Sequence, residues 1–309
     1  NEQRATMKTI RPNYPLAGQR CTVFALAAVG MLSGASAVSA ASLKGQVMGA
    51  GEPVAQSTVT LWSASASAPK QLAQVRTDAS GRFSLSAPDA GPGTSLYLVA
   101  QGGQSAANKA AGNNPAIGLI TVLGSKAPAA VTINEMTTIA SVWTHNQFIN
   151  GAAIQAQPLQ LKIAAGNVPS FVNLATGGWG GTIQDPLNSG QTPTMGNFAT
   201  LASVLAGCVT QVRPDACQTV FRAAQGHTGA APTDTLTAAQ AIARAPWYQP
   251  ERTFKALEAL YPVPAGKNLR PVPYMPYLQV APSAWVLPLK FDGGGYRAGG
   301  KAMFDAEGN

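Results

Sequence analysis

The early part of the chain alternates apolar and polar residues with the period of a β-strand. In the segment STVTLW, Val59 and Leu61 point to one face, while Thr58, Thr60 and Trp62 point to the other. Further short segments of this kind follow, separated by turns. The pattern predicts a small antiparallel β-sandwich. Its strands are expected at residues 43–49, 57–64, 71–78, 81–87, 95–101 and 128–133.

The segment TDASGRFSL predicts a turn between two of these strands. Gly81 can adopt the positive φ that such a turn requires, because it has no Cβ. Phe83 and Leu85, two residues apart on the following strand, are then expected to point into the sandwich.

After residue 130 the apolar residues recur with the period of an α-helix. Asn134 is expected to cap the first helix, and Glu135 suits the positive end of its dipole. Thr233 or Asp234 caps a later helix. The pattern predicts a bundle of short helices with long connections. The helices are expected at residues 134–149, 167–175, 195–209, 215–224, 234–245 and 251–261.

The change of period divides the chain into parts and gives a multi-domain fold of α and β type. A β-sandwich is expected over residues 41–130 and a helical domain over residues 131–262. Residues 263–309 are expected to form a Pro- and Gly-rich linker and a first β-strand of a further domain.

The N-terminal residues have the composition of an export signal. Translation is expected to begin at Met7, and the basic residues that follow it precede a run of apolar residues. Val38 and Ala40 suit the positions before signal-peptidase cleavage, so residues 1–40 are expected to be removed, together with Cys21. A transmembrane anchor is the alternative, but the apolar run is shorter than the roughly 20 residues that span a bilayer. The mature protein is therefore expected to be secreted or periplasmic.

Charge is sparse and scattered. The chain has a formal net charge of +8, and without the four basic residues and one acidic residue of residues 1–40 the charge falls to +5. No run of Lys or Arg and no basic stripe remains, so nucleic acid is excluded as a partner. No second apolar run is long enough to span a membrane.

Two cysteines remain after export. Cys208 and Cys217 stand at the end of one expected helix and the start of the next, and in an oxidising compartment they are expected to form a disulfide. A metal site is the alternative, but His145 and His227 stand at no recognised ligand spacing from the two thiols. We expect His145 on a helix surface and His227 in a loop.

No catalytic motif occurs in the sequence. The G-x-S-x-G elbow, the H-E-x-x-H motif, the Walker A loop and an intact dinucleotide fingerprint are all missing. Glu135 with Asp185, or Glu251 with Glu258, could pair as acid and base, but Glu251 and Glu258 are more simply explained as a solvated helix face. We therefore predict no catalytic residue, no cofactor and no metal.

Two polar or aromatic stretches near the C-terminus are candidate contact regions. DGGGYRAGG is a turn, or a ligand contact through Tyr296 and Arg297. RPVPYMPYLQVAPSAW is expected to be an extended linker that packs along the domains, and a docking surface for a partner is the alternative.

The N-terminal motifs resemble a known family. GQVMGAGEPVAQSTVTLW followed by VRTDASGRFSL is similar to the carboxypeptidase regulatory-like, or transthyretin-like, domain over about residues 43–100. This resemblance implies a β-sandwich that acts as a non-catalytic spacer or adhesion module. The residues that carry the likeness are structural ones: Gly45, Pro53, Val59, Leu61, Asp78, Gly81 and Phe83.

The rest of the chain resembles exported bacterial proteins that carry NHL-type or streptogramin-lyase-like β-propellers. The likeness rests on TINEMTTIASVW, LASVLAGCVTQVRPDACQTVF and APTDTLTAAQAIARAPWYQPERTFKAL, and covers most of residues 131–260. KAMFDAEGN then resembles the repeated turn of a propeller blade, in which case the chain is a fragment that stops inside the first blade.

Two functions follow from these expectations. The first is a non-catalytic exported platform, a sandwich and a helical module of a larger propeller protein, which binds an extracellular ligand, glycan or protein. The alternative is the N-terminal part of a propeller enzyme similar to the streptogramin lyases or lactonases, whose catalytic residues would lie beyond Asn309.

Overall fold

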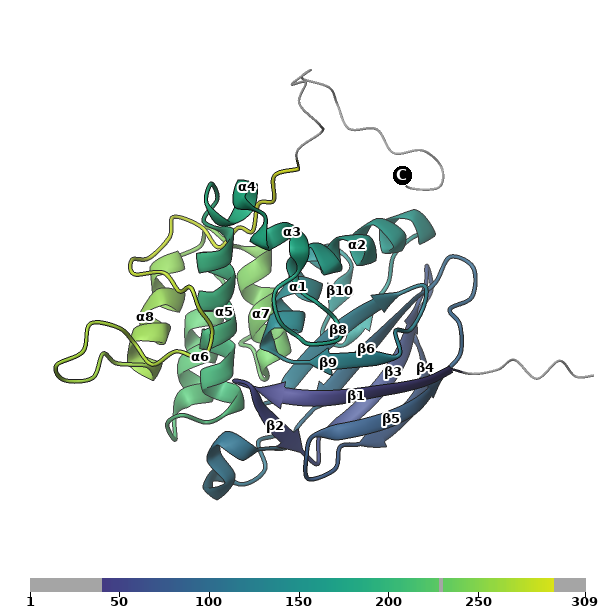
Figure 1. Cartoon of the computed structure of the whole chain (residues 1–309), viewed down its shortest axis with the longest axis horizontal. Helices are drawn as coiled ribbons and strands as arrows, with labels where there is room; N and C mark the ends of the chain where they lie inside the picture. Colours follow the sequence, from purple (N-terminus) through teal and green to yellow (C-terminus); the bar gives the residue numbers. More distant parts are fainter. Residues whose placement is uncertain (1–40, 228–229, 292–309) are drawn as a thin grey trace, which may run out of the picture. The chain divides into compact units, whose positions relative to one another are not determined.

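The computed structural model describes residues 41–227 and 230–291, which belong to one compact unit. The unit is of mixed α and β structure, with antiparallel sheets on one side and helices on the other (Figure 1). The strands are β1 (Ala41–Gly49), β2 (Glu52–Ala55), β3 (Thr58–Ala64), β4 (Lys70–Arg76), β5 (Arg82–Ala87), β6 (Ser95–Gln101), β7 (Gln104–Ser105), β8 (Gly118–Gly124), β9 (Ala130–Ile133), β10 (Ile149–Asn150) and β11 (Ala153–Ile154).

The longer strands form two sheets. One has the order β5–β1–β2–β7, with β9 added to β1 as a parallel neighbour, and the other has the order β4–β3–β6–β8. Leu43 and Val54 of the first sheet meet Leu61 and Leu98 of the second in one apolar cluster. The two sheets therefore bury one face each against the other.

The alternation of β3 and β5 is confirmed. Val59 and Leu61 are fully buried in the cluster between the sheets, as are Phe83 and Leu85 apart from 6% of their surfaces. Trp62, on the opposite face of β3, stacks on the ring of Tyr97 with centroids 6.4 Å apart.

The predicted turn before β5 is present. Asp78 Oδ1 accepts hydrogen bonds from the backbone N–H groups of Ser80, at 2.8 Å, and Arg82, at 2.9 Å. Gly81 has φ +70°, and a Cβ at this position would lie 2.5 Å from the carbonyl oxygen of Val47. Glycine is thus required both by the backbone conformation and by the close approach of β1.

Helices cover the second face of the β4–β3–β6–β8 sheet. The helices are α1 (Glu135–His145), α2 (Pro158–Phe171), α3 (Gly181–Gln184), α4 (Pro186–Ser189), α5 (Thr194–Val209), α6 (Ala216–Ala224), α7 (Thr235–Arg244) and α8 (Pro250–Leu260), and a 3-10 helix, η1, spans Ala106–Ala111.

Strands β6 and β8 are buried on both faces. Leu98 and Leu119 pack between the sheets, while Val99 and Ile120, one residue further along each strand, pack against the helices with Met136 of α1. Strand β8 was not among the predicted strands. Its sequence, GLITVLG, is apolar on both faces and shows no alternation.

The starts of two helices are confirmed, but the first helix ends at His145 rather than at residue 149, and one helix was misplaced. Asn134 and Asp234 accept hydrogen bonds from the N–H groups of Thr137 and Thr237, so both are N-caps. The helix predicted at residues 167–175 is wrong in its bounds, because α2 begins at Pro158 and ends at Phe171.

Hydroxyl side chains of the helices pair with the free edge of β8. The backbone N–H groups of alternate strand residues donate to these hydroxyl oxygens at 3.0 to 3.1 Å, so helix side chains replace a further strand. The pairs are Gly118 with Thr235, Ile120 with Thr138, and Val122 with Ser141.

The predicted disulfide is confirmed. Cys208, near the end of α5, is bonded to Cys217, near the start of α6, and the two Cα atoms lie 4.3 Å apart. The bond closes a short loop between the two helices. Cys21 lies outside the described residues.

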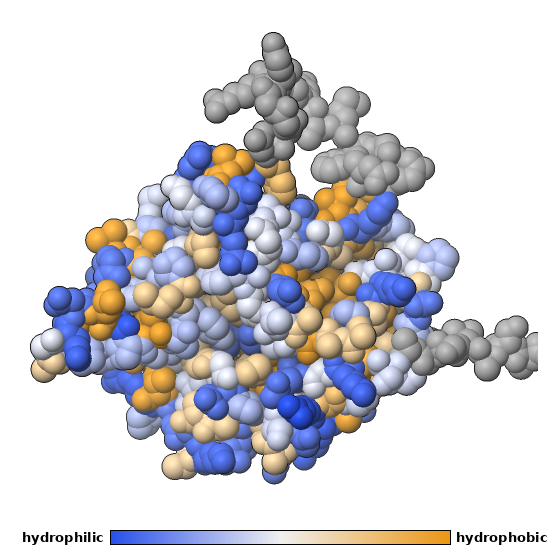
Figure 2. All heavy atoms as spheres, viewed as in Figure 1, coloured by the Kyte–Doolittle hydropathy of each residue, from blue (hydrophilic) through white to orange (hydrophobic). Residues whose placement is uncertain are grey.

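No helix in residues 41–227 and 230–291 is long and apolar enough to cross a membrane. On the face drawn in Figure 2, apolar residues stand in small groups among polar ones.

Residues 262–291, which we call the C-terminal strap, run without helix or strand across the helical layer (Figure 1, yellow). Side chains spaced three residues apart on α5 bind the backbone of the strap. This agrees with the predicted linker that packs along the domains. The pairs are Thr194 with Pro288 O, Asn197 with Val286 O, Thr200 with Leu278 N, and Ser203 with Tyr274 N.

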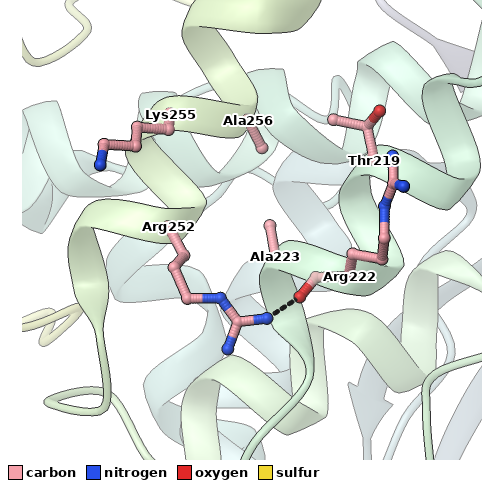
Figure 3. Close-up of a pocket in the computed structure, with 6 residues that line it drawn as sticks. All are labelled: Thr219, Arg222, Ala223, Arg252, Lys255 and Ala256. Carbon is pink, nitrogen blue, oxygen red and sulfur yellow. Dashed lines mark hydrogen bonds between the residues drawn. The ribbon is translucent and has the colours of Figure 1, made fainter.

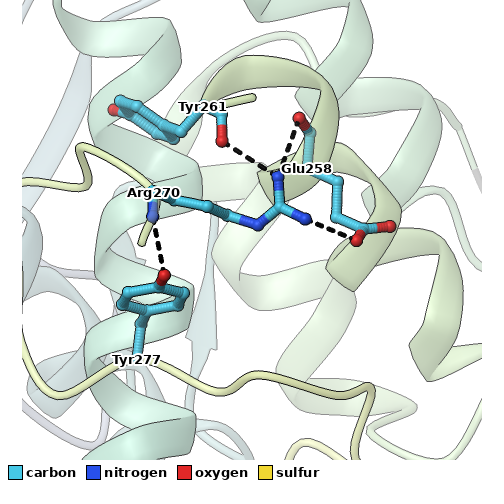
Figure 4. Close-up of polar contacts among 4 residues, drawn as sticks. All are labelled: Glu258, Tyr261, Arg270 and Tyr277. Carbon is cyan, nitrogen blue, oxygen red and sulfur yellow. Dashed lines mark hydrogen bonds and ion pairs between the residues drawn. The ribbon is translucent and has the colours of Figure 1, made fainter. Parts of the chain in front are cut away.

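Arg270 fixes the start of the strap to the end of α8 (Figure 4). Its guanidinium donates to Glu258 Oε1 at 2.7 Å and to the Tyr261 carbonyl at 3.1 Å, and its backbone N–H donates to the Tyr277 hydroxyl at 2.8 Å. Glu258 thus forms an ion pair, whereas Glu251 on the same helix is exposed.

Candidate functional site

A groove of about 390 Å³ lies between the end of α1 and the outer face of α2. The last turn of α1 and the residues after it form one wall, and α2 forms the other. On α2 the lining residues follow the spacing of one helix face. The lining residues are Trp143, Thr144, Asn146, Gln147 and Phe148 on the first wall, and Gln160, Ile163, Ala164 and Asn167 on the second.

Three of the four side-chain amides that line the groove are oriented by internal hydrogen bonds. Asn146 Nδ2 donates to the carbonyl of Ala243 at 2.9 Å, and Asn146 Oδ1 is buried without a partner among the described residues. Gln160 Oε1 accepts from the N–H of Gln157 at 2.9 Å. Asn167 Nδ2 donates to the carbonyl of Ile163 at 3.0 Å. These bonds leave the NH₂ of Gln160 and the Oδ1 of Asn167 for another molecule.

The aromatic wall of the groove is held by the strap. Trp143 Nε1 donates to the carbonyl of Trp285 at 3.0 Å. Trp285 is itself 1% exposed, and it donates from its backbone N–H to Pro246 and from Nε1 to Pro250. The position of the Trp143 ring therefore depends on residues far away in the sequence.

None of the nine residues that line the groove is charged. His145 is adjacent in sequence, but it is fully buried rather than on the helix surface, so that prediction was wrong. His145 Nδ1 lies 3.0 Å from the Ser141 carbonyl and 2.9 Å from Thr144 Oγ1. Burial lowers the pKa of His145 to about 4, so the ring is neutral at neutral pH.

A buried carboxyl group lies at the other end of α1. The Glu135 carboxyl accepts hydrogen bonds from the N–H of Ala50 at 3.1 Å and from the Tyr274 hydroxyl at 2.6 Å. Burial raises the pKa of Glu135 to about 7, against the effect of these hydrogen bonds. Burial and the nearby Glu135 raise the pKa of Tyr261 and of Tyr274. The carboxyl is fully enclosed and joins the β1–β2 turn to the strap.

The other carboxylates considered as acid–base pairs have separate structural roles. Asp185 accepts a hydrogen bond from the N–H of Leu187 at the start of α4, while Glu135 binds Ala50 and Tyr274. His227 is exposed, and its ring lies against Tyr248 with centroids 5.3 Å apart.

A second, shallower cleft of about 280 Å³ lies between α6 and α8 (Figure 3). Arg222, Arg252 and Lys255 give it a positive charge. The Arg252 guanidinium donates to the carbonyls of Arg222 and Gln225, so it ties the two helices together. The hydrogen-bonding capacity of the Arg252 guanidinium is therefore largely used inside the protein.

Within residues 41–227 and 230–291 no three His, Cys, Asp or Glu side chains come together as a metal site would require. The candidate ligand contacts Tyr296 and Arg297 lie outside the described residues.

Sequence reasoning missed the groove because it misplaced α2. The signal was present: Pro158 suits the first position of a helix, and a helix begun there places Gln160, Ile163 and Asn167 on one face.

No protein-family model matches the chain, and no curated protein matches its sequence.

Proposed function

We propose that the described residues form a non-catalytic binding module of an exported protein, and that the groove between α1 and α2 holds the ligand. The observation that carries this proposal is the groove itself. Its volume of about 390 Å³ lies within the range of small-molecule sites, about 300–1,000 Å³. It combines one aromatic wall with a few oriented polar groups, which is the usual make-up of such sites.

The walls of the groove are fixed before a ligand arrives. Trp143 is held by the carbonyl of Trp285, and Asn146 by that of Ala243. A preformed site loses less conformational entropy on binding, which favours a binding role for this surface.

The fold family is part of the proposal. We propose that the two sheets are a β-sandwich of the carboxypeptidase regulatory-like type. The hydrogen bonds of Asp78 in the T-D-x-x-G turn and the burial of Phe83 support this resemblance. The propeller stays a prediction, because the residues that resemble a blade lie outside the described ones.

Export is proposed on the composition of residues 1–40, and the Cys208–Cys217 disulfide supports an oxidising compartment. Expression of the full chain in a bacterial host with N-terminal sequencing of the product tests this. We expect a periplasmic or secreted product that begins at Ala41, and a cytoplasmic product with an intact N-terminus would contradict it.

The binding role is tested with neutral probes on the full chain. The probes are a set of oligosaccharides and a set of blocked, uncharged tripeptides, and binding is measured by calorimetry. In Asn167→Trp the new side chain occupies the groove, whereas Lys162→Trp places the same ring on another face of α2. We expect a probe that binds wild type and Lys162→Trp but not Asn167→Trp, and binding that is equal in all three proteins would refute the role of the groove.

A further inference from the structure

We propose that the groove between α1 and α2 is a site for a neutral carbohydrate, either a single pyranose or a short oligosaccharide. This inference rests on the proposed binding function and names its ligand class. It draws on three properties of the lining residues: the absence of charge among them, the mixture of free amide donors and acceptors, and the aromatic surface beside these amides.

The residues that line the groove offer no charged group to a ligand. The nine lining residues carry no ionisable side chain, and His145 beside them is buried and neutral. A phosphate, a carboxylate or an ammonium group would lose its hydration here without gaining a partner of opposite charge. The ligand is therefore uncharged.

The amides of the groove offer both hydrogen-bond donors and acceptors. The Gln160 NH₂ is a donor, the Asn167 Oδ1 is an acceptor, and the amide of Gln147, which has no side-chain hydrogen bond among the described residues, offers both. Neighbouring hydroxyl groups of a sugar also donate and accept at once, so one ring can satisfy several of these amides. A purely apolar ligand would bury the amides unpaired, which costs free energy.

An aromatic surface lies beside the amides of the groove. Trp143 and Phe148 line the same wall as the amides. The C–H groups on the flat face of a pyranose can pack on such rings while its hydroxyl groups reach the opposite wall on α2. Because Trp143 is anchored through the carbonyl of Trp285, its ring is ready for this contact without rearrangement.

The volume agrees with this ligand class. A groove of about 390 Å³ is near the lower end of small-molecule sites, so it suits one ring or two linked rings rather than a long chain. An uncharged peptide is the rival ligand, and the experiment separates the two.

The experiment titrates the full chain, in its oxidised form, with cellotriose, maltotriose, laminaritriose and N,N′-diacetylchitobiose, and separately with blocked tripeptides. Calorimetry measures the affinity. Because the chain has five tryptophans, the fluorescence change that is absent in Trp143→Phe reports on Trp143. We expect at least one sugar to bind with one site per chain. Asn167→Ala and Gln160→Ala are expected to weaken it about five- to tenfold, because each removes one hydrogen bond between neutral groups. Lys162→Ala is the matched control and is expected to leave the affinity unchanged.

The outcomes separate this inference from the proposed function. If tripeptides bind and are lost in Asn167→Trp while no sugar binds, the groove is a binding site and the carbohydrate inference is wrong. If a sugar binds but Asn167→Trp has the affinity of wild type, the site is elsewhere and the inference is wrong. If neither class binds, both statements fail. Circular dichroism with thermal melting establishes that each variant is folded.

Discussion

Two buried groups on α1 are expected to make stability depend on pH in opposite directions. Glu135 has a folded-state pKa of about 7 against an ordinary value of 4.5. Below pH 4.5 the carboxyl is protonated in both states. As the pH rises to 7 the unfolded chain ionises while the folded protein keeps its proton, so the free energy of unfolding falls. The shift corresponds to about 3 kcal/mol, at 1.36 kcal/mol per pKa unit.

His145 acts in the reverse sense. Its folded-state pKa is about 4 against an ordinary value of 6.5. Above pH 6.5 the ring is neutral in both states. As the pH falls to 4 the histidine of the unfolded chain is protonated, whereas the buried ring of the folded protein stays neutral. The free energy of unfolding therefore again falls by about 3 kcal/mol. Between pH 4.5 and 6.5 the two groups change the free energy of unfolding in opposite directions, so in the wild-type protein these changes are expected to cancel.

Two variants without an ionisable side chain at the substituted position separate these contributions. In Glu135→Gln the side chain can still accept from the N–H of Ala50 and can donate to the Tyr274 hydroxyl. In His145→Asn the amide nitrogen can still donate to the Ser141 carbonyl. Neither variant needs to leave a backbone group unpaired, so both are expected to fold.

The assay is urea unfolding of the three proteins at pH values from 4 to 8, with the disulfide intact. Glu135→Gln is expected to lose about 3 kcal/mol as the pH falls from 7 to 4, because only the histidine contribution remains. His145→Asn is expected to lose about 3 kcal/mol as the pH rises from 4.5 to 7. Contributions from other groups are common to all three proteins and drop out of the comparison. Parallel pH profiles for the three proteins would refute the reasoning.

Two further predictions concern the covalent and polar links of the helical layer. Replacement of Cys208 and Cys217 by Ser should lower the free energy of unfolding by roughly 2 to 3 kcal/mol, as measured by urea unfolding, because the unfolded chain is no longer closed into a short loop. Thr200→Val removes the acceptor of the partly buried Leu278 N–H, and should cost about 1 kcal/mol and speed chymotryptic cleavage after Tyr277. An unchanged cleavage rate would show that α5 does not hold the strap.

The sheets could be predicted where one strand face is polar. Strands β3 and β5 alternate, and their inward residues Val59 and Phe83 lie where the pattern placed them. Strand β8 has the sheet core on one face and helices on the other, so both faces are apolar and the period of two disappears. The strand that joins the sheets to the helices was therefore not predicted.

Helix α2 was harder to place than the other long helices, because its sequence contains residues that disfavour a helix interior. Gly166 and Pro169 lie inside α2, and residues of this kind usually interrupt a helix. The groove depends on that helix, so it was missed when the helix was misplaced. The disulfide was predicted, because the two cysteines stand at the end of one expected helix and the start of the next in a chain that is expected to be exported.

One structural device explains why hydroxyl and amide side chains are buried in the helical layer. Buried Ser, Thr and Asn side chains on α1 and α5 take the place of backbone partners. Thr138 and Ser141 satisfy the edge of β8, while Asn197 and Thr200 satisfy the strap. Because α1 and α5 pair with irregular or edge backbone through their own side chains, their buried faces carry polar residues among the apolar ones. A polar residue on these two helices therefore does not mark an exposed face, which departs from the rule by which helix surfaces are usually recognised.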